Sequence, residues 1–285
     1  MLLDLVEIRT DDGLRLPGGF FSPASPPRRG AVDAVLIITG TFSQDLWTTL
    51  ASRLAAAGYP ALTVSARTHA VDWLDLDTNT HWGSAYQTIA QIPLDYHAAV
   101  RTLRDRGYQR LALFGHSIAG TRALWYAAHD PDPALVAVIS SAGPSFSEET
   151  FAPRAAEFAA ARARAEALVA EGRGRELTRF DFPQQNAVLT PESWLDTYCG
   201  GHYDVRRWLH RLRVPVLRLE CEREAPANLP LIEPFWDDFR RLAPPHPRHR
   251  KVVVGGADHS YRSGLSAAGD AVVDWLATLD EAAAK

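Results

Sequence analysis

The sequence predicts a single α/β fold in which a mostly parallel sheet carries helices on both faces. Short apolar runs alternate with stretches of helical periodicity along most of the chain, which is the pattern of right-handed βαβ crossovers. The run AVDAVLIITG (31–40) is nearly continuous in β-branched and other apolar residues, as expected for a strand buried on both faces of a parallel sheet. A chain of 285 residues is also long enough to bury a large continuous core.

The first half of the chain predicts a hairpin followed by regular alternation of strands and helices. LVEIRT and LRLPGGFF flank the turn Asp11-Asp12-Gly13 and predict an antiparallel pair. The elements then expected are a strand over 31–40, a helix ending at Gly58, a strand over 60–66, an irregular polar and aromatic stretch over 67–87, a helix over 88–106, a strand over 110–116, a helix ending at His129 and a strand over 135–143.

Between 144 and 213 the alternation stops. PRAAEFAAARARAEALVAEG (153–172) is alanine-rich, with arginine and glutamate at turn spacing, and predicts a strong helix. About seventy residues between two core strands are too many for a loop and too few for an independent domain. We therefore expect a helical cap (144–213) inserted in a core formed by 1–143 and 214–285. The elements expected after the cap are strands over 214–221 and 250–256 and a last helix over 265–279.

Bulk properties point away from several classes of protein. The formal net charge is −4 and the arginines form no basic stripe, so no nucleic-acid partner is expected. No window approaches the roughly eighteen apolar residues of a membrane span, and the N-terminus lacks the pattern of a signal peptide; we expect a cytoplasmic protein. Cys199 and Cys221 have no metal-ligand spacing, and reduced thiols are the interpretation that we favour. Without a dinucleotide, P-loop or H-E-x-x-H motif, neither cofactor nor metal is expected.

The stretch RLALFGHSIAGTR (110–122) places a serine between a buried strand and a helix. A nucleophile elbow needs a sharp strand-to-helix turn, with small residues two positions before and two positions after the serine. Gly115 and Ala119 occupy those positions, where the usual pattern has two glycines. A tight turn without chemistry is the alternative interpretation. The strand before and the helix after favour Ser117 as a nucleophile.

His259, in VVVGGADHSY, lies in the loop expected after the last strand. Loops at the carboxyl ends of parallel strands meet at one edge of the sheet, the edge that carries Ser117. His259 is therefore the predicted general base, although a loop histidine bonded only to the backbone is the alternative. His116, next to the serine, is expected to point away from it and to be structural.

A histidine base needs a carboxylate that fixes its tautomer, and the loop after strand 214–221 offers several. Glu224 lies where the chain has left the sheet, so we favour it over Glu220, which is expected within the strand, and over Glu222. Asp258 adjoins His259, but adjacent side chains on a loop seldom face each other.

With these residues the sequence resembles the α/β-hydrolase superfamily. The superfamily order of nucleophile, acid and base matches Ser117, Glu224 and His259, and the resemblance covers almost the whole chain, including a cap after the strand that follows the nucleophile helix. One departure is glutamate as the acid, where aspartate is commoner. A second is the segment from Arg67 to Ser84, which is similar to a D-x-R-G-x-G-x-S motif split by an insertion.

The resemblance implies an oxyanion hole of two backbone N–H groups. One belongs to Ile118, directly after the nucleophile. The other belongs to Thr41 or Phe42, because Thr39-Gly40 stands where the family commonly has His-Gly.

A serine nucleophile in this superfamily implies acyl transfer to water through an acyl-enzyme. We expect a carboxylic ester or thioester of a small to medium, apolar or aromatic substrate. A carbon–carbon bond hydrolase or lyase, or a non-catalytic binding member, is the alternative; an intact set of serine, histidine and acid disfavours the last. The aromatic residues expected to line the substrate pocket, or else to pack the cap on the core, are Trp82, Tyr86, Trp194 and Tyr198.

Overall fold

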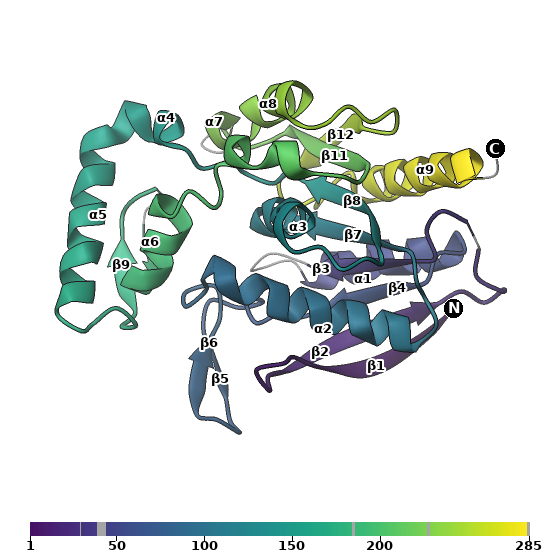
Figure 1. The fold of residues 1–285 in the computed structure, drawn as a ribbon, viewed down its shortest axis with the longest axis horizontal. Coiled ribbons are helices and arrows are strands. Elements are labelled where there is room, and N and C mark those ends of the chain that lie inside the picture. Colours follow the sequence, from purple (N-terminus) through teal and green to yellow (C-terminus); the bar gives the residue numbers. More distant parts are fainter. Residues whose placement is uncertain (29, 39–43, 184–185, 227–228, 284–285) are drawn as a thin grey trace.

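A computed structural model describes residues 1–28, 30–38, 44–183, 186–226 and 229–283. The described residues form an eight-stranded sheet with strand order β1-β2-β4-β3-β7-β8-β11-β12 (Figure 1). β1 and β2 form the expected antiparallel hairpin, β2 is antiparallel to β4, and the remaining pairs are parallel. These strands are β1 (Leu2–Arg9), β2 (Arg15–Ser22), β3 (Ala34–Ile38), β4 (Ala61–Val64), β7 (Leu111–His116), β8 (Leu135–Ser141), β11 (Val216–Arg223) and β12 (Arg250–Asp258).

Helices cover both faces of the sheet, as predicted. One face packs against α2, α3 and α8, and the other packs against α1 and α9 (Figure 1). The helices of the core are α1 (Gln44–Ala56), η1 (Ile89–Gln91), α2 (Ile92–Asp105), α3 (Ile118–His129), α7 (Leu229–Ile232), α8 (Pro234–Leu242) and α9 (Leu265–Ala283).

Strand β3 shows why its sequence is apolar throughout. Ala34, Leu36 and Ile38 point into the hydrophobic cluster beneath α2 and α3. Val35 and Ile37 alternate with them and point into the cluster beneath α1 and α9. Because successive side chains of a strand face opposite sides of the sheet, a strand between two helical layers must be apolar at every position.

Most of the segment between β8 and β11 forms a layer that is separate from the core, drawn at the left of Figure 1. Its elements are α4 (Glu148–Phe151), η2 (Ala152–Arg154), α5 (Ala155–Ala170), β9 (Thr178–Phe180), β10 (Ala187–Leu189), α6 (Pro191–Cys199), η3 (Val205–Arg207) and η4 (Leu209–Arg211). This layer has its own small cluster, in which Phe151, Phe180, Phe182 and Trp194 are buried. From Tyr203 onward the segment packs instead with the core cluster beneath α2 and α3.

The structure contains a hairpin where the sequence suggested only an irregular stretch. β5 (Trp73–Asp75) pairs with β6 (Thr80–Trp82) in antiparallel register, and the hairpin projects away from the sheet (Figure 1). The side chain of Asp75 closes the turn, since it accepts hydrogen bonds from the Asp77 N–H and the Thr78 hydroxyl. Strands of three residues are too short to display a period of two in the sequence.

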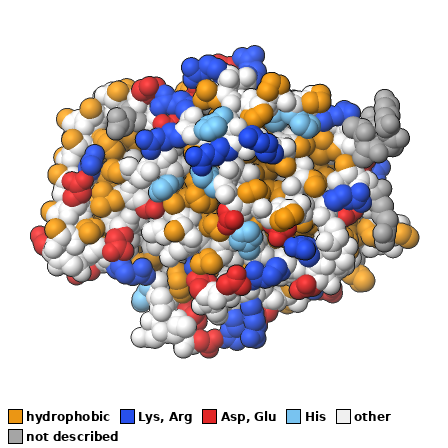
Figure 2. Space-filling model, viewed as in Figure 1, with side chains coloured by type: hydrophobic (Ala, Val, Ile, Leu, Met, Phe, Trp, Pro, Cys, Tyr) orange, Lys and Arg blue, Asp and Glu red, His pale blue; other side chains and the backbone are white. Residues whose placement is uncertain are grey.

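The surface mixes both signs of charge with hydrophobic side chains over the face drawn in Figure 2. In the part of the chain that the structure describes, no helix combines the length and the apolar character needed to cross a membrane.

Candidate active site

Ser117 stands at a sharp turn between β7 and α3. Its backbone has φ +55° and ψ −135°, a conformation that costs a residue with a Cβ atom about 1–3 kcal/mol. The Ser117 N–H donates to the Ser141 carbonyl at 2.9 Å, which ties the turn to β8. A Cβ atom at Gly115 would lie 2.2 Å from the Ala119 carbonyl oxygen. The turn therefore requires glycine at 115, whereas alanine fits at 119, where it is buried.

The structure brings Ser117, His259 and Glu224 together at the carboxyl ends of three strands. His259 follows β12 directly, and its Nε2 lies 3.0 Å from the Ser117 Oγ. Its Nδ1 lies 2.9 Å from Oε2 of Glu224, which follows β11 directly. The Glu224 side chain is 3% exposed and that of His259 is 29% exposed. A buried carboxylate that accepts from Nδ1–H leaves the lone pair of Nε2 directed at the serine hydroxyl.

The other acidic residues near this edge have different partners. Glu220, within β11, forms ion pairs with Lys251 at 2.6 Å and with Arg218 at 3.4 Å. Glu222 accepts a hydrogen bond of 2.7 Å from the Gly256 N–H. Asp258 accepts from the Arg262 N–H at 3.0 Å.

Of the predicted oxyanion donors, one is described. Ile118 is the first residue of α3, and the first N–H groups of a helix have no intrahelical acceptor and carry partial positive charge. Its N–H is thus suited to stabilise an oxyanion formed beside Ser117. Thr41 and Phe42 lie outside the described residues.

His116 forms part of a buried network behind His259. Its ring centroid lies 5.1 Å from that of His259, and its Nδ1 lies 3.4 Å from the Ser141 Oγ. Ser141 donates in turn to the Tyr261 hydroxyl at 2.8 Å. Burial, together with the nearby His259, lowers the pKa of His116 to about 3, so its ring is neutral at neutral pH. The sequence indicated only that His116 is structural; its packing against His259 needed the register of β7 against β8.

The four predicted pocket aromatics divide into two groups. Trp194 and Tyr198 lie in α6 and pack on each other inside the separate aromatic cluster. Trp194 is fully buried there, and its indole N–H donates to the Phe182 carbonyl at 2.9 Å. Trp82 and Tyr86 belong to the core part of the chain, outside the segment between β8 and β11. The guanidinium of Arg67 sits 5.0 Å from the Trp82 ring, and Tyr86 contacts the ring of His81.

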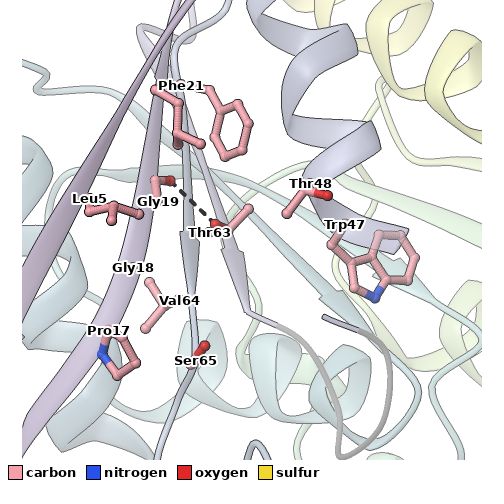
Figure 3. A pocket seen from close by; sticks show the side chains of 11 residues that line it. Leu5, Pro17, Gly18, Gly19, Phe21, Trp47, Thr48, Thr63, Val64 and Ser65 are labelled. Carbon is pink, nitrogen blue, oxygen red and sulfur yellow. Dashed lines mark hydrogen bonds between the residues drawn. The ribbon is translucent and has the colours of Figure 1, made fainter. Parts of the chain in front are cut away.

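A pocket of about 260 Å³ lies between the hairpin β1–β2, β4 and the start of α1 (Figure 3). A Cβ atom at Gly19 would approach Leu3, Thr63 and Phe21 within 3.1–3.3 Å, so this glycine helps to keep the space open. The pocket is lined by Leu3, Leu5, Pro17, Gly18, Gly19, Phe21, Trp47, Thr48, Thr63, Val64 and Ser65. None of the Ser117, His259 and Glu224 set is among these residues.

No family model matches the sequence, and no curated protein matches it significantly. Solved structures do match. A thermostable carboxyl esterase from Bacillus coagulans is similar with 10% identity and a TM-score of 0.68, covering 98% of this chain and 99% of that chain. GrgF, an α/β-hydrolase from a Penicillium species, matches with 15% identity and a TM-score of 0.69, covering 99% of this chain and 100% of that chain. The chain has the α/β-hydrolase fold. An esterase domain from Rhodothermus marinus agrees, with 18% identity, a TM-score of 0.59, and 96% and 98% of the two chains covered.

In an α/β-hydrolase fold, a serine at the turn after a central strand is exposed at the carboxyl edge of the sheet. The Ser117 turn after β7 is at that place. Within the described ranges, no group of three or more histidine, cysteine or acidic side chains could hold a metal ion. The chemistry that the arrangement supports is nucleophilic attack by a serine with a histidine as proton acceptor.

Proposed function

We propose that the protein is a serine hydrolase that cleaves carboxylic esters or thioesters through an acyl-enzyme. The observation that carries this proposal is the continuous hydrogen-bonded chain from Ser117 Oγ to His259 Nε2 and from His259 Nδ1 to Glu224. Its support in the comparisons is that the similar solved structures include esterases.

The proposed reaction begins when His259 Nε2 accepts the proton of the Ser117 hydroxyl as its oxygen attacks the substrate carbonyl. Glu224 stabilises the imidazolium that forms. The N–H of Ile118, with a second donor at Thr41 or Phe42, binds the oxyanion. His259 then gives its proton to the leaving alcohol or thiol, which departs and leaves Ser117 acylated. Water attacks the acyl-enzyme by the same route and releases the acid.

We further propose that the segment 144–213 is a cap whose position governs substrate choice. The substrates that we propose are small to medium esters or thioesters with an apolar or aromatic body. Trp82 and Tyr86 would contact that body, and the ring of Tyr86 faces the guanidinium of Arg175 in this segment at 5.7 Å. A carbon–carbon bond hydrolase would use the same serine and histidine, and the assay below distinguishes the two reactions.

The test combines a covalent label with a substrate panel. A fluorophosphonate should label the wild type, and Ser117→Ala should abolish labelling because the attacking oxygen is gone. Ser25→Ala, at an exposed loop serine, is the matched control and should label normally. p-Nitrophenyl esters of increasing acyl length should be hydrolysed by the wild type with a burst of p-nitrophenol.

Equal labelling of Ser117→Ala and wild type would overturn the assignment of the nucleophile. Labelling of Ser117 without hydrolysis of any ester or thioester would instead favour carbon–carbon bond cleavage.

A further inference from the structure

Arg122, in α3, is a buried cation whose hydrogen-bond acceptors are all neutral. The residue is 2% exposed. Its Nε donates to the Tyr203 hydroxyl at 2.9 Å, its Nη1 donates to the Thr68 hydroxyl at 3.3 Å, and its Nη2 donates to the side-chain oxygen of Gln87. Among the described residues no carboxylate forms an ion pair with it. Buried arginines are normally paired with an anion, because an unpaired charge in the interior is unfavourable.

Asp196, in α6, interacts electrostatically with Arg122 but does not supply that anion. One of its carboxylate oxygens accepts from the Ile89 N–H at 2.8 Å, and the other lies 3.8 Å from Nε2 of His202. Burial raises the pKa of Asp196, whereas the hydrogen bond from Ile89 and the charges of His202 and Arg122 act in the opposite direction. Neither oxygen of Asp196 forms an ion pair with the guanidinium. The charge of Arg122 therefore has no contacting counter-charge.

A second observation comes from α6. The hydroxyls of Ser193 and Thr197 are buried and have no hydrogen-bond partner among the residues that the structure describes. Ser193 is 0% and Thr197 is 3% exposed. They are four residues apart, so they lie on the same face of the helix. Two buried hydroxyls without partners indicate a missing polar group at this face.

Two hydrogen bonds show what that face of α6 covers. The Thr190 N–H donates to the Ala85 carbonyl at 2.7 Å, and the Ile89 N–H donates to Asp196. These bonds join both ends of α6 to the two ends of the segment 85–89.

Gln87 lies at the middle of that segment, and Ser193 lies between the two α6 anchors. The free hydroxyls belong to the helix that covers this segment, and the guanidinium of Arg122 bonds Gln87 in the middle of the segment. We call the region around 85–89, between α3 and α6, the junction.

Arg122 and Ser117 lie at the same end of α3, since Ser117 precedes the helix and Arg122 is its fifth residue. Five residues correspond to a rise of about 7.5 Å, and long helical side chains lean back toward the helix N-terminus. The guanidinium is therefore expected in the N-terminal half of α3, the half that begins at the nucleophile. Thr68, which accepts from it, follows β4 at the same carboxyl edge of the sheet.

We propose that this junction binds a carboxylate of the substrate, so that the esters cleaved at Ser117 carry a free carboxylate in addition to the scissile bond. The proposal rests on the proposed hydrolase function. The planar guanidinium of Arg122 would exchange its neutral acceptors on Thr68 and Gln87 for two parallel hydrogen bonds to the carboxylate. The hydroxyls of Ser193 and Thr197 would donate to the same anion.

The experiment compares matched charged and neutral esters. Monomethyl adipate and monomethyl glutarate place a carboxylate on the acyl side, with the dimethyl esters as neutral partners after correction for two equivalent scissile bonds. 3-Acetoxybenzoate and its methyl ester do the same on the alcohol side. The wild type should show a kcat/KM at least about tenfold higher for the charged member of one pair, as hydrogen bonds to charged groups predict.

The ratio of charged to neutral kcat/KM within each variant is the readout, because it cancels a general loss of active protein. Arg122→Gln should bring the ratio to one or below, whereas Arg122→Lys should retain part of the preference. Ser193→Ala should lower the ratio several-fold. Arg104→Gln, the same change at a half-exposed arginine of α2, should leave the ratio unchanged. As a readout independent of turnover, adipate should raise the Tm of Ser117→Ala, and adipamide should not.

A wild-type ratio at or below one in every pair, or a preference that survives Arg122→Gln, would overturn the carboxylate subsite and assign the junction to bound water. Such a result, with neutral esters still hydrolysed at Ser117, leaves the hydrolase function standing. Loss of the function itself shows differently, because then no ester is cleaved and Ser117 is not labelled.

Discussion

The core and the layer formed by α4, α5 and α6 are stabilised in different ways. The core has two large hydrophobic clusters, one on each face of the sheet. The outer layer has one small aromatic cluster, and Ala165 is the one buried residue of α5. The layer therefore has far less buried apolar surface per residue than the core, and it depends on a few aromatic contacts.

The proposed catalytic residues also belong to the core. Ser117, Glu224 and His259 all directly follow core strands, where hydrogen bonding within the sheet holds their backbones. None of the three belongs to the outer layer. The proposed catalytic set can therefore stay in place while the outer layer loosens, and perturbing the two regions should give separable effects.

The largest expected effect is a lower kcat, caused by a substitution in the core that leaves the fold intact. Glu224→Gln should lower kcat by roughly 10²–10⁴-fold, because an amide neither stabilises the imidazolium nor fixes the productive tautomer. Steady-state kinetics on a p-nitrophenyl ester measures it. Glu222→Gln is the matched control and should change kcat little, because the Glu222 carboxylate accepts a hydrogen bond from the Gly256 N–H and none from His259. A larger loss in Glu222→Gln than in Glu224→Gln would contradict the assignment of the acid.

The next effect compares two buried tryptophans directly. Trp194→Ala in the outer layer and Trp275→Ala in α9 each remove a fully or nearly fully buried indole bonded to a carbonyl, so each should cost about 3–5 kcal/mol of local stability. Calorimetry of Trp194→Ala should show an early transition followed by a core transition near that of the wild type. Trp275→Ala should lower the main transition itself.

If both variants lost stability in one shared transition by the same amount, the outer layer and the core would be a single cooperative unit. The separation proposed above would then be wrong.

The smallest effect is an acid sensitivity that belongs to the core alone. The pKa of His116 is lowered to about 3 in the folded protein. Below pH 6.5 the unfolded chain therefore binds a proton at His116 more readily than the folded protein does. Stability from this group is fully present above pH 6.5 and declines as the pH falls toward 3. Between pH 7 and 5 the loss should be about 2 kcal/mol, as measured by urea unfolding. His116→Gln should remove this part of the slope, and His210→Gln, at an exposed histidine, should not.

Much of the core could be predicted because its signals are local. The apolar runs at β3, β7 and β8 are continuous, since both faces are buried, and each is followed by a helical period. The same regularity placed Ser117 and His259 at one edge of the sheet. The sequence favours Glu224 over Glu222 because Glu224 is expected where the chain has left the sheet. In the structure β11 continues to Arg223, and Glu224 is the first residue beyond it.

Other features depend on contacts that the sequence does not display. Arg122 lies in a helix that the sequence predicts, but its neutral partners come from 68, 87 and 203, far apart in the chain. The hairpin β5–β6 and the helix α7 are too short to show a clear period in the sequence. Helix α8 is also short, although its buried residues Phe235 and Phe239 have helical spacing. The sequence suggests Trp194 and Tyr198 for the pocket because aromatic residues in a cap serve substrate contact and packing equally well. In the structure Trp194 is buried in the aromatic cluster, and Tyr198 is partly buried and packs against it.

The backbone of Ser117 has a consequence for laboratory evolution. Its positive φ is unfavourable for serine and comfortable for glycine. A library selected only for heat resistance should therefore enrich Ser117→Gly, a change that relaxes the turn and removes the attacking oxygen at once. The variants that survive such a selection would be more stable but inactive. Variants stabilised in this way must therefore be assayed for turnover as well as for heat resistance.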